Sequence, residues 1–458
     1  MGISLDGLSS GLDTTTLITA LMQSAALPQN LLKAQVTSTT AEITALQSLN
    51  SKIASLATLA TAAGKPAALD IFSATSSASN VAATVSTGAA AGELQVVVSA
   101  LAQNQIGVSA AMAIWPSPGT ITIVGHSGTP LTITPASTSL DDVAKAVNAS
   151  AAGVVATKVA SGTDGSGNPL YRLQFSSKAT GADAAFSVYQ GSTVDPAANL
   201  LTAPGAAITK VAQDASVTLW AGTSAEQAVT SSTNSFANLL PGVSVTVSAV
   251  STTPTTITVG RDATAVSTKV GALVDSLNLV FSVIDNQSSN STVTNADGTT
   301  SIKAGVFAGD STIRDVDSKI LTAATAPING HSPSEYGISI TKSGTITFDA
   351  DKFKAALAAD PDTVNAAVQE IATRVAAAAT TASDKYDGQL TQRITGDQSS
   401  VTALGRQIAD WDVRLASRKS TLERTFSSME VLLSNMKAQS SALTSQLSAF
   451  TTSSSSGN

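Results

Sequence analysis

Cysteine is absent from this 458-residue chain, and histidine occurs only at His126 and His331. Without cysteine, the chain has no disulfides, no thiol catalysis and no cysteine-ligated metals. Charged residues make up only 12% of the chain, whereas 43% of the residues are hydrophobic, which is enough for buried cores in about three domains. The polar surface must therefore come largely from Ser, Thr, Asn, Gln and Gly, and stability must come from cores and assembly.

Export and binding signals are missing as well. No Lys or Arg occurs between Met1 and Asn30, and the segment lacks the apolar core of a signal peptide, so standard secretory export is not expected. Asp6 stands where a myristoylation motif requires Ser or Thr. No run of 18 apolar residues occurs, which predicts no membrane insertion. Nucleic-acid binding usually requires a basic surface, and a net charge of -7 does not indicate one.

Catalytic patterns are weak. His126 and His331 both lie in stretches rich in Gly, Ser and Pro, which are typical of solvated turns rather than of catalytic bases. Asp349 and Asp351 could act as paired carboxylates, but capping of a helix accounts for Asp349 without a reaction. No G-x-x-x-x-G-K run supports nucleotide hydrolysis. We therefore expect no enzymatic activity and no cofactor.

One segment imitates the start of a calcium loop. Asp164, Ser166 and Asn168 have the spacing of the first ligands of such a loop. Phe175 occupies the place of the bidentate glutamate, however, so a hairpin turn is the better interpretation, and no metal site is expected.

A long apolar stripe runs through the C-terminal end of the chain. Its members, spaced mostly by threes and fours, are Val401, Leu404, Ile408, Trp411, Leu415, Leu422, Phe426, Met429, Leu433, Met436, Leu443, Leu447 and Phe450. The spacing shifts by one place after Arg418 and Lys419, which predicts a coiled-coil seam with one stutter. No proline interrupts residues 387–450, and 60 residues at 1.5 Å each would make a helix of roughly 90 Å.

A second stripe lies near the N-terminus. Its members are Val36, Ile43, Leu46, Leu49, Ile53, Leu56 and Leu59. The simplest arrangement pairs the two terminal helices as an antiparallel stalk, with the middle of the chain forming a head. The alternative is that both are ordinary bundle helices; the length of the C-terminal stripe and the placement of both stripes at the termini favour the stalk.

The middle of the chain is rich in predicted strands. They lie at 94–98, 120–124, 131–134, 171–175, 217–220, 243–247, 256–259, 338–340 and 346–348. Ser139 should cap a short helix, Asp262 should begin a longer helix, and residues 287–301 should form an exposed loop. Asp310, Asp349 and Asp360, the last followed by Pro361, should begin further helices.

These patterns predict an α+β multidomain fold, in which a terminal antiparallel coiled-coil stalk carries β-rich head domains inserted between the two terminal helices. The expected divisions are a flexible segment 1–16, a stalk of 17–65 with 363–458, a β-rich head domain of 66–104 with 206–362, and an inserted α+β module of 105–205.

Several separated motifs together resemble one known family. They are Ser10-Gly11-Leu12-Asp13, Leu94–Val98 followed by 100–105, Pro241-Gly242-Val243, Arg261-Asp262, 308–314, 344–349, Asp360-Pro361, and Phe426 with Met429-Glu430, Met436, Gln439 and Leu443. In this order they resemble the flagellar filament cap family, also called hook-associated protein 2 or FliD. Gly119–Val188 is similar to the inserted repeat of flagellins and caps.

The resemblance implies a structural cap at the distal tip of a bacterial flagellar filament, which promotes polymerisation of exported flagellin and prevents its loss. It implies a ring-shaped homo-oligomer of about five or six subunits outside the cell. The expected partners are other copies of the chain, flagellin, the flagellar type III export apparatus and an export chaperone. Self-assembly or flagellin contact is expected at Ile43, Leu46, Ile53, Leu56, Val401, Leu404, Ile408, Trp411, Leu415, Phe426, Met429, Met436 and Leu443.

Other functions remain open from the residues alone. The Thr-rich head would suit a surface adhesin at the flagellar tip, and adhesion is compatible with a cap. Another axial protein, such as a hook-filament junction protein, would have similar terminal helices. A hydrolase with an unrecognised carboxylate site would require several aspartates in one cleft.

Overall fold

The computed structural model describes Gly11 and residues 13–453 of the chain. Most of the predicted flexible segment 1–16 lies outside the described residues, and Phe450 lies outside those whose side chains are described. The chain divides into two compact units. The helical unit joins the described residues up to Leu69 with those from Ala263 on, and the β unit comprises Asp70–Asp262. The predicted mixture of helices and sheets, with a long C-terminal helix, is confirmed.

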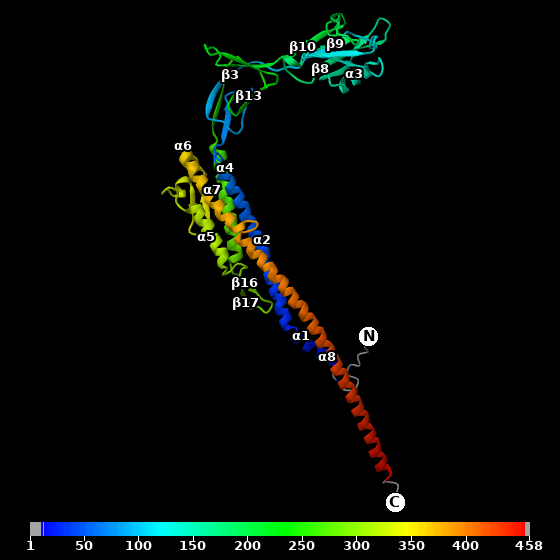
Figure 1. Ribbon diagram of the computed structural model, residues 1–458, viewed down its shortest axis with the longest axis vertical. Helices are drawn as coiled ribbons and strands as arrows, with labels where there is room; N and C mark the ends of the chain where they lie inside the picture. The colour runs from blue at the N-terminus through cyan, green and yellow to red at the C-terminus, as the bar shows by residue number, and fades with distance from the viewer. Residues whose placement is uncertain (1–10, 12, 454–458) are drawn as a thin grey trace. The chain divides into compact units, whose positions relative to one another are not determined.

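The helical unit is organised around α2, which packs against α4, α7 and α8 (Figure 1). Its helices are α1 (Thr14–Ala25), α2 (Leu27–Ala63), α4 (Ala263–Ser288), α5 (Ser311–Thr325), η3 (Pro333–Tyr336), α6 (Ala350–Ala359), α7 (Pro361–Ser383) and α8 (Gln389–Ser453). Its strands form two hairpins, β16 (Ser291–Thr294) with β17 (Thr300–Lys303), and β18 (Ile338–Ile340) with β19 (Ile346–Phe348).

Aspartates set the starts of α5, α6 and α7, as predicted. The carboxylate of Asp310 accepts hydrogen bonds from the first backbone amides of α5, and Asp349 does the same for α6. Asp360 accepts from the amide of Thr363, while Pro361 occupies the start of α7. Each cap satisfies amides that have no partner within the helix, and each contributes about 1 kcal/mol to stability.

The helix α4 is long and apolar enough, by length and composition, to span a membrane. Its apolar face is instead buried within the helical unit, where Val270, Leu277 and Val280 are at most 1% exposed. A helix that packs against α2 and α6 through such a face is the core helix of a bundle.

Residues 263–362 were expected in the β-rich head, and the structure contradicts this expectation. The helices α4, α5 and α6 belong to the helical unit, because α4 packs against α2, α5 against α7, and α6 against both α4 and α7. The apolar face of α4 needs a long helical neighbour, and α2 provides one. The periodicity of α4 predicted its helix but could not identify this neighbour.

The loop expected at 287–301 is also different. The helix α4 continues to Ser288, and β16 pairs with β17 around the Asp297-Gly298 turn. All eight strand residues are exposed. These strands therefore have no buried face, and it is a buried face that would produce an alternating apolar and polar pattern in the sequence.

The β unit contains the remaining strands. They are β1 (Phe72–Ser76), β2 (Val81–Val85), β3 (Gly92–Ala100), β4 (Ile106–Val108), β5 (Ile121–Gly125), β6 (Pro130–Ile133), β7 (Val154–Thr163), β8 (Pro169–Ser177), β9 (Phe186–Gln190), β10 (Ala207–Lys210), β11 (Ala215–Leu219), β12 (Gln227–Ser231), β13 (Ser235–Leu240), β14 (Val243–Val247) and β15 (Thr255–Arg261). The helices α3 (Leu140–Ala149), η1 (Ala182–Ala184) and η2 (Pro196–Ala198) complete it.

Two hydrophobic cores hold the β unit. One lies between the sheet β1-β15-β3-β11-β12 and the sheet β13-β14-β2, and its residues come from Val81–Ala102 and Ala215–Val259. The other lies between α3, the sheet β10-β4-β8-β7 and the sheet β6-β5-β9, and its residues fall between Trp115 and Leu201. The order β5, β6, α3, β7 matches the predicted strand, strand, helix, strand order. Trp220, predicted at the end of a strand, instead lies in the following turn with φ of 49°.

Gly337 offers a direct test of the packing in the helical unit. Its φ is +81°, and an added Cβ would lie 2.5 Å from the carbonyl oxygen of Asp349, at the start of α6. We expect Gly337→Ala to lower the free energy of unfolding by about 1–3 kcal/mol through backbone strain, with a further cost from this clash. Gly344→Ala is the matched control, because its φ of +84° is similar but the space around it is open. Equal urea midpoints for the two variants would contradict the predicted clash.

Candidate assembly interface

The helices α2 and α8 run antiparallel, and polar contacts define their alignment. Near the start of α2, the side-chain amide of Gln29 donates a hydrogen bond to Asp412 of α8 over 2.5 Å. Further along α2, Asn50 donates to Thr391 near the start of α8 over 3.4 Å. Gln29 is 4% exposed whereas Asp412 is exposed, so this part-buried contact lies at the edge of the helix pair. Because the two contacts join fixed positions of α2 and α8, they favour one antiparallel register.

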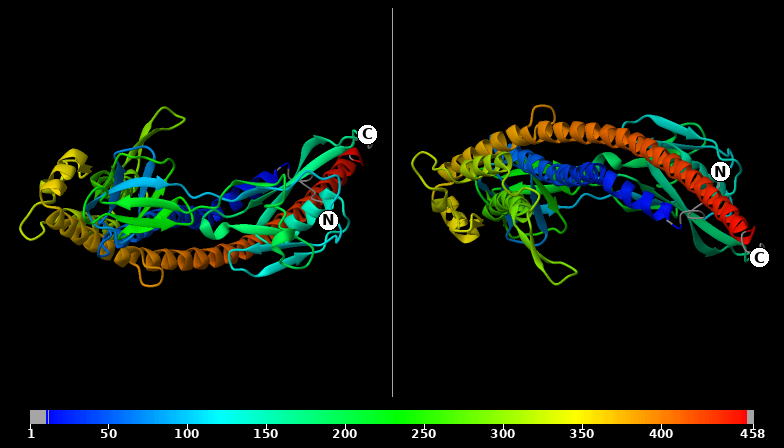
Figure 2. Two further views of the ribbon diagram at one scale, coloured as in Figure 1. Left: turned by 90° about the horizontal axis from the view of Figure 1, so that it is seen from above. Right: turned by 90° about the horizontal axis from the view of Figure 1, so that it is seen from below.

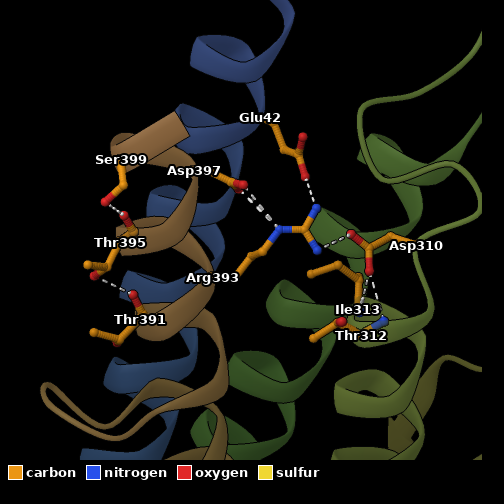
Figure 3. Close-up of polar contacts among 9 residues, drawn as sticks. All are labelled: Glu42, Asp310, Thr312, Ile313, Thr391, Arg393, Thr395, Asp397 and Ser399. Atoms are coloured by element: carbon orange, nitrogen blue, oxygen red, sulfur yellow. Dashed lines mark hydrogen bonds and ion pairs between the residues drawn. The ribbon is translucent and has the colours of Figure 1, made fainter. Parts of the chain in front are cut away.

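A charged cluster links the start of α8 to α2 and to the start of α5 (Figure 3). The guanidinium of Arg393 lies 2.6 Å from Glu42 of α2, 3.1 Å from Asp397 of α8 and 3.8 Å from Asp310. Asp310 also caps α5. One arginine therefore links α2, α5 and α8.

The electrostatics of the cluster favour the charged arginine. Partial burial acts to lower the pKa of Arg393, but the negative charges of Asp397, Glu42 and Asp310 outweigh it and raise the pKa. The three carboxylates have side chains 14–25% exposed, so water screens them poorly from one another. The positive charge of Arg393 thus offsets the mutual repulsion of the three carboxylates.

Five of the predicted contact residues are buried within the subunit itself. Ile43, Leu46, Ile53, Leu56 and Leu404 are at most 9% exposed, because α2 packs against α4, α7 and α8. Their side chains belong to the core of the helical unit and do not offer a surface to another molecule. Contact with other copies or with flagellin is therefore expected only at the remaining residues of the C-terminal stripe.

The C-terminal stripe becomes more exposed toward the end of α8. Its half-buried members include Val401, Ile408, Trp411, Leu415, Phe426 and Met429. Met436 is 52% exposed and Leu443 is 63% exposed. First α2 and then α1 contact α8, and the final turns of α8 extend beyond both (Figures 1 and 2). The part of the chain that the structure describes thus leaves this end of the apolar stripe uncovered.

Two features of this region were not predicted. Exposed leucines at Leu17, Leu21, Leu27 and Leu31 continue the apolar surface onto α1 and the start of α2. Their spacing indicates a helix but not which face is left open. The Arg393 cluster was also missed, because only its contact with Asp397, four residues away, is visible in the sequence.

The candidates for chemistry occupy ordinary structural positions. His126 pairs with Asp183, and His331 pairs with Glu335, all with side chains more than half exposed. The predicted turn at Asp164 is confirmed, since its carboxylate accepts hydrogen bonds from Asn168 and from the amide of Ser166, and these lower its pKa. Among the described residues, no group of three or more His, Asp or Glu residues is arranged to hold a metal ion.

Comparisons with known proteins agree on one family. Models of the N-terminus and the C-terminus of flagellar hook-associated protein 2 match residues 10–105 and 212–438. Flagellar hook-associated protein 2 of Escherichia coli O157:H7 is 28% identical over 392 residues, which cover 80% of each chain. B-type flagellar hook-associated protein 2 of Pseudomonas aeruginosa is 28% identical over 427 residues, which cover 86% of each chain.

A solved structure shares the fold. The crystal structure of the D1-D2-D3 domains of the flagellar cap protein FliD from Escherichia coli aligns with a TM-score of 0.57 and 24% identity. The alignment covers 77% of this chain and 99% of that chain. The two family models, which match both ends of the chain in order, carry the assignment: the chain belongs to the flagellar hook-associated protein 2 family.

Proposed function

We propose that this chain caps the distal tip of a bacterial flagellar filament, where it promotes polymerisation of exported flagellin and prevents its loss to the medium. Membership of the hook-associated protein 2 family supports a structural cap rather than an enzyme. The single observation that carries the mechanism is the apolar stripe of α8, which is half-covered by α2 and α1 and then continues into solvent.

An uncovered apolar helix end favours assembly, because burying it against another chain removes apolar surface from water. The terminal helices α1, α2 and α8 form the coiled-coil stalk in this proposal, and the β unit forms the head. The residues proposed for self-assembly or flagellin contact are Val401, Ile408, Trp411, Leu415, Phe426, Met429, Met436 and Leu443.

The proposed assembly is a ring of about five or six copies outside the cell, as the family resemblance implies. Flagellin is the proposed client, and the flagellar type III apparatus with an export chaperone is the proposed route. Terminal helices whose apolar surface is covered only on assembly would also suit passage through a narrow export channel, because these segments need not be fully ordered until they bind.

A deletion strain tests the proposal. We expect short or absent filaments and unpolymerised flagellin in the culture medium, with both defects reversed by the full-length gene. Electron microscopy of filaments and immunoblots of cell-free medium provide the measurements. Filaments of normal length and normal swimming in the deletion strain would show that the chain is not the cap.

A further inference from the structure

A second face of α8 lies beside the part of the apolar stripe that α1 and α2 cover, and it includes Met436 and Leu443 from the uncovered end of that stripe. Its residues are Arg414, Arg418, Thr425, Leu432, Met436 and Leu443. They follow one another by four or seven positions, so they share one face of the helix. All of them are exposed, and Leu432 and Leu443 are each 63% exposed. We call these six residues the open seam of α8.

The open seam has a basic end and an apolar end. Arg418 lies 14 positions before Leu432, which corresponds to about 21 Å along a helix. Within the described part of the chain, no carboxylate pairs with Arg414 or Arg418. The guanidinium of Arg414 instead lies over the ring of Trp411, 5.5 Å from its centre. The neighbouring Lys419 differs, since it lies 3.9 Å from Glu423.

We propose that the open seam binds an amphipathic helix of another protein, which carries carboxylates at one end of its apolar stripe. A helical partner follows from the spacing, since a helix matches positions repeated by fours and sevens over the 30 residues 414–443. The carboxylates of the partner helix follow from charge. Arg414 and Arg418 have no carboxylate partner and lie beside an apolar surface, so acidic side chains on the partner would complement them.

A second copy of α8 does not fit this surface. Parallel pairing through the open seam places Arg414 against Arg414 and Arg418 against Arg418, and such like-charge contacts are unfavourable. Antiparallel pairing about the middle of the seam places Arg414 against Leu443. The arginines would then lose contact with water and gain no carboxylate partner, which is unfavourable. The exposed leucines of α1 and α2 offer no acid either, because residues 14–32 contain no charged side chain.

This inference rests on the proposed function, under which the partner is flagellin. The probe is therefore monomeric flagellin from the same bacterium, and the protein is the full chain. The test variant is the double replacement Arg414→Glu with Arg418→Glu. The matched control is Arg406→Glu with Arg424→Glu, which changes the net charge equally. Positions 406 and 424 lie five helical turns apart and so share one face, which is turned by about 80° from Arg414 at 3.6 residues per turn.

We expect the test variant to bind flagellin at least about tenfold more weakly than the wild type at low salt. Binding by the wild type should weaken as salt rises, whereas binding by the test variant should change much less. The control variant should bind as the wild type does. Circular dichroism and thermal unfolding should be unchanged in both variants, because all four arginines are exposed. In the deletion strain, the test variant should leave flagellin in the medium and the control should restore filaments.

Three results would overturn the inference. One is wild-type affinity and full complementation by the test variant. Another is an equal loss in both variants, which would indicate general charge attraction. The third is the absence of flagellin binding by the wild type at either salt concentration. The deletion phenotype is a separate readout, so a cap that fails this test remains a cap.

Discussion

Replacement of Ile53 by alanine is expected to lower the free energy of unfolding of the helical unit by about 2–5 kcal/mol. Ile53 is completely buried on α2, in the region where this helix packs against its neighbours. Removal of its side chain forfeits burial of apolar surface and leaves a cavity that a helix held on several sides cannot close easily. Urea unfolding of the full chain, followed by the helical circular dichroism signal, measures the loss.

The control for this experiment lies on the same helix. Leu31 is 72% exposed, so Leu31→Ala should change the stability by no more than about 0.5 kcal/mol. The pair of variants compares a core position with a surface position on one helix. A small effect of Ile53→Ala would mean that α2 is held loosely and that its stripe is available to other chains.

Loss of the Arg393 charge is also expected to destabilise the helical unit. Arg393→Met retains most of the apolar stem but leaves Glu42, Asp310 and Asp397 without their common partner. Removal of one member of a buried ion pair costs about 3–5 kcal/mol, and the 40% exposure of Arg393 reduces our expectation to about 1–3 kcal/mol. The loss should appear in the unfolding of the helical unit, since the cluster joins α2, α5 and α8.

A second replacement identifies the cause of that loss. Asp397→Asn in the Arg393→Met background removes one of the repelling charges and should recover part of the stability. Lys419→Met is the control, because its contact with Glu423 is more than half exposed on both sides and should contribute no more than about 0.5 kcal/mol. No recovery in the double variant would show that lost hydrogen bonds, rather than repulsion, dominate.

The structure changes the interpretation of the two terminal stripes. Both have the same periodicity, yet Ile43 to Leu56 are core residues and Met436 and Leu443 are surface residues. Periodicity identifies the face that will be buried, but not whether the neighbour is another helix of the same subunit or another molecule. Here α2 is surrounded by α4, α7 and α8, whereas the end of α8 extends beyond α1 and α2.

Local features were determined by the sequence alone. Helix starts at Asp310, Asp349 and Asp360 were predictable because a cap depends on a few adjacent residues. The long C-terminal helix was predictable because its apolar spacing continues without a proline. The family was recognisable because its short motifs recur in order along the chain.

Only the tertiary structure decided which distant segments meet. It placed α4, α5 and α6 with the terminal helices instead of the head, joined Arg393 to Glu42 and Asp310, and left one face of α8 open. Each of these outcomes depends on contacts between residues tens to hundreds of positions apart, which no local spacing encodes. The physical reason is that an apolar face or a charge requires a partner, and many segments can supply one until the chain packs.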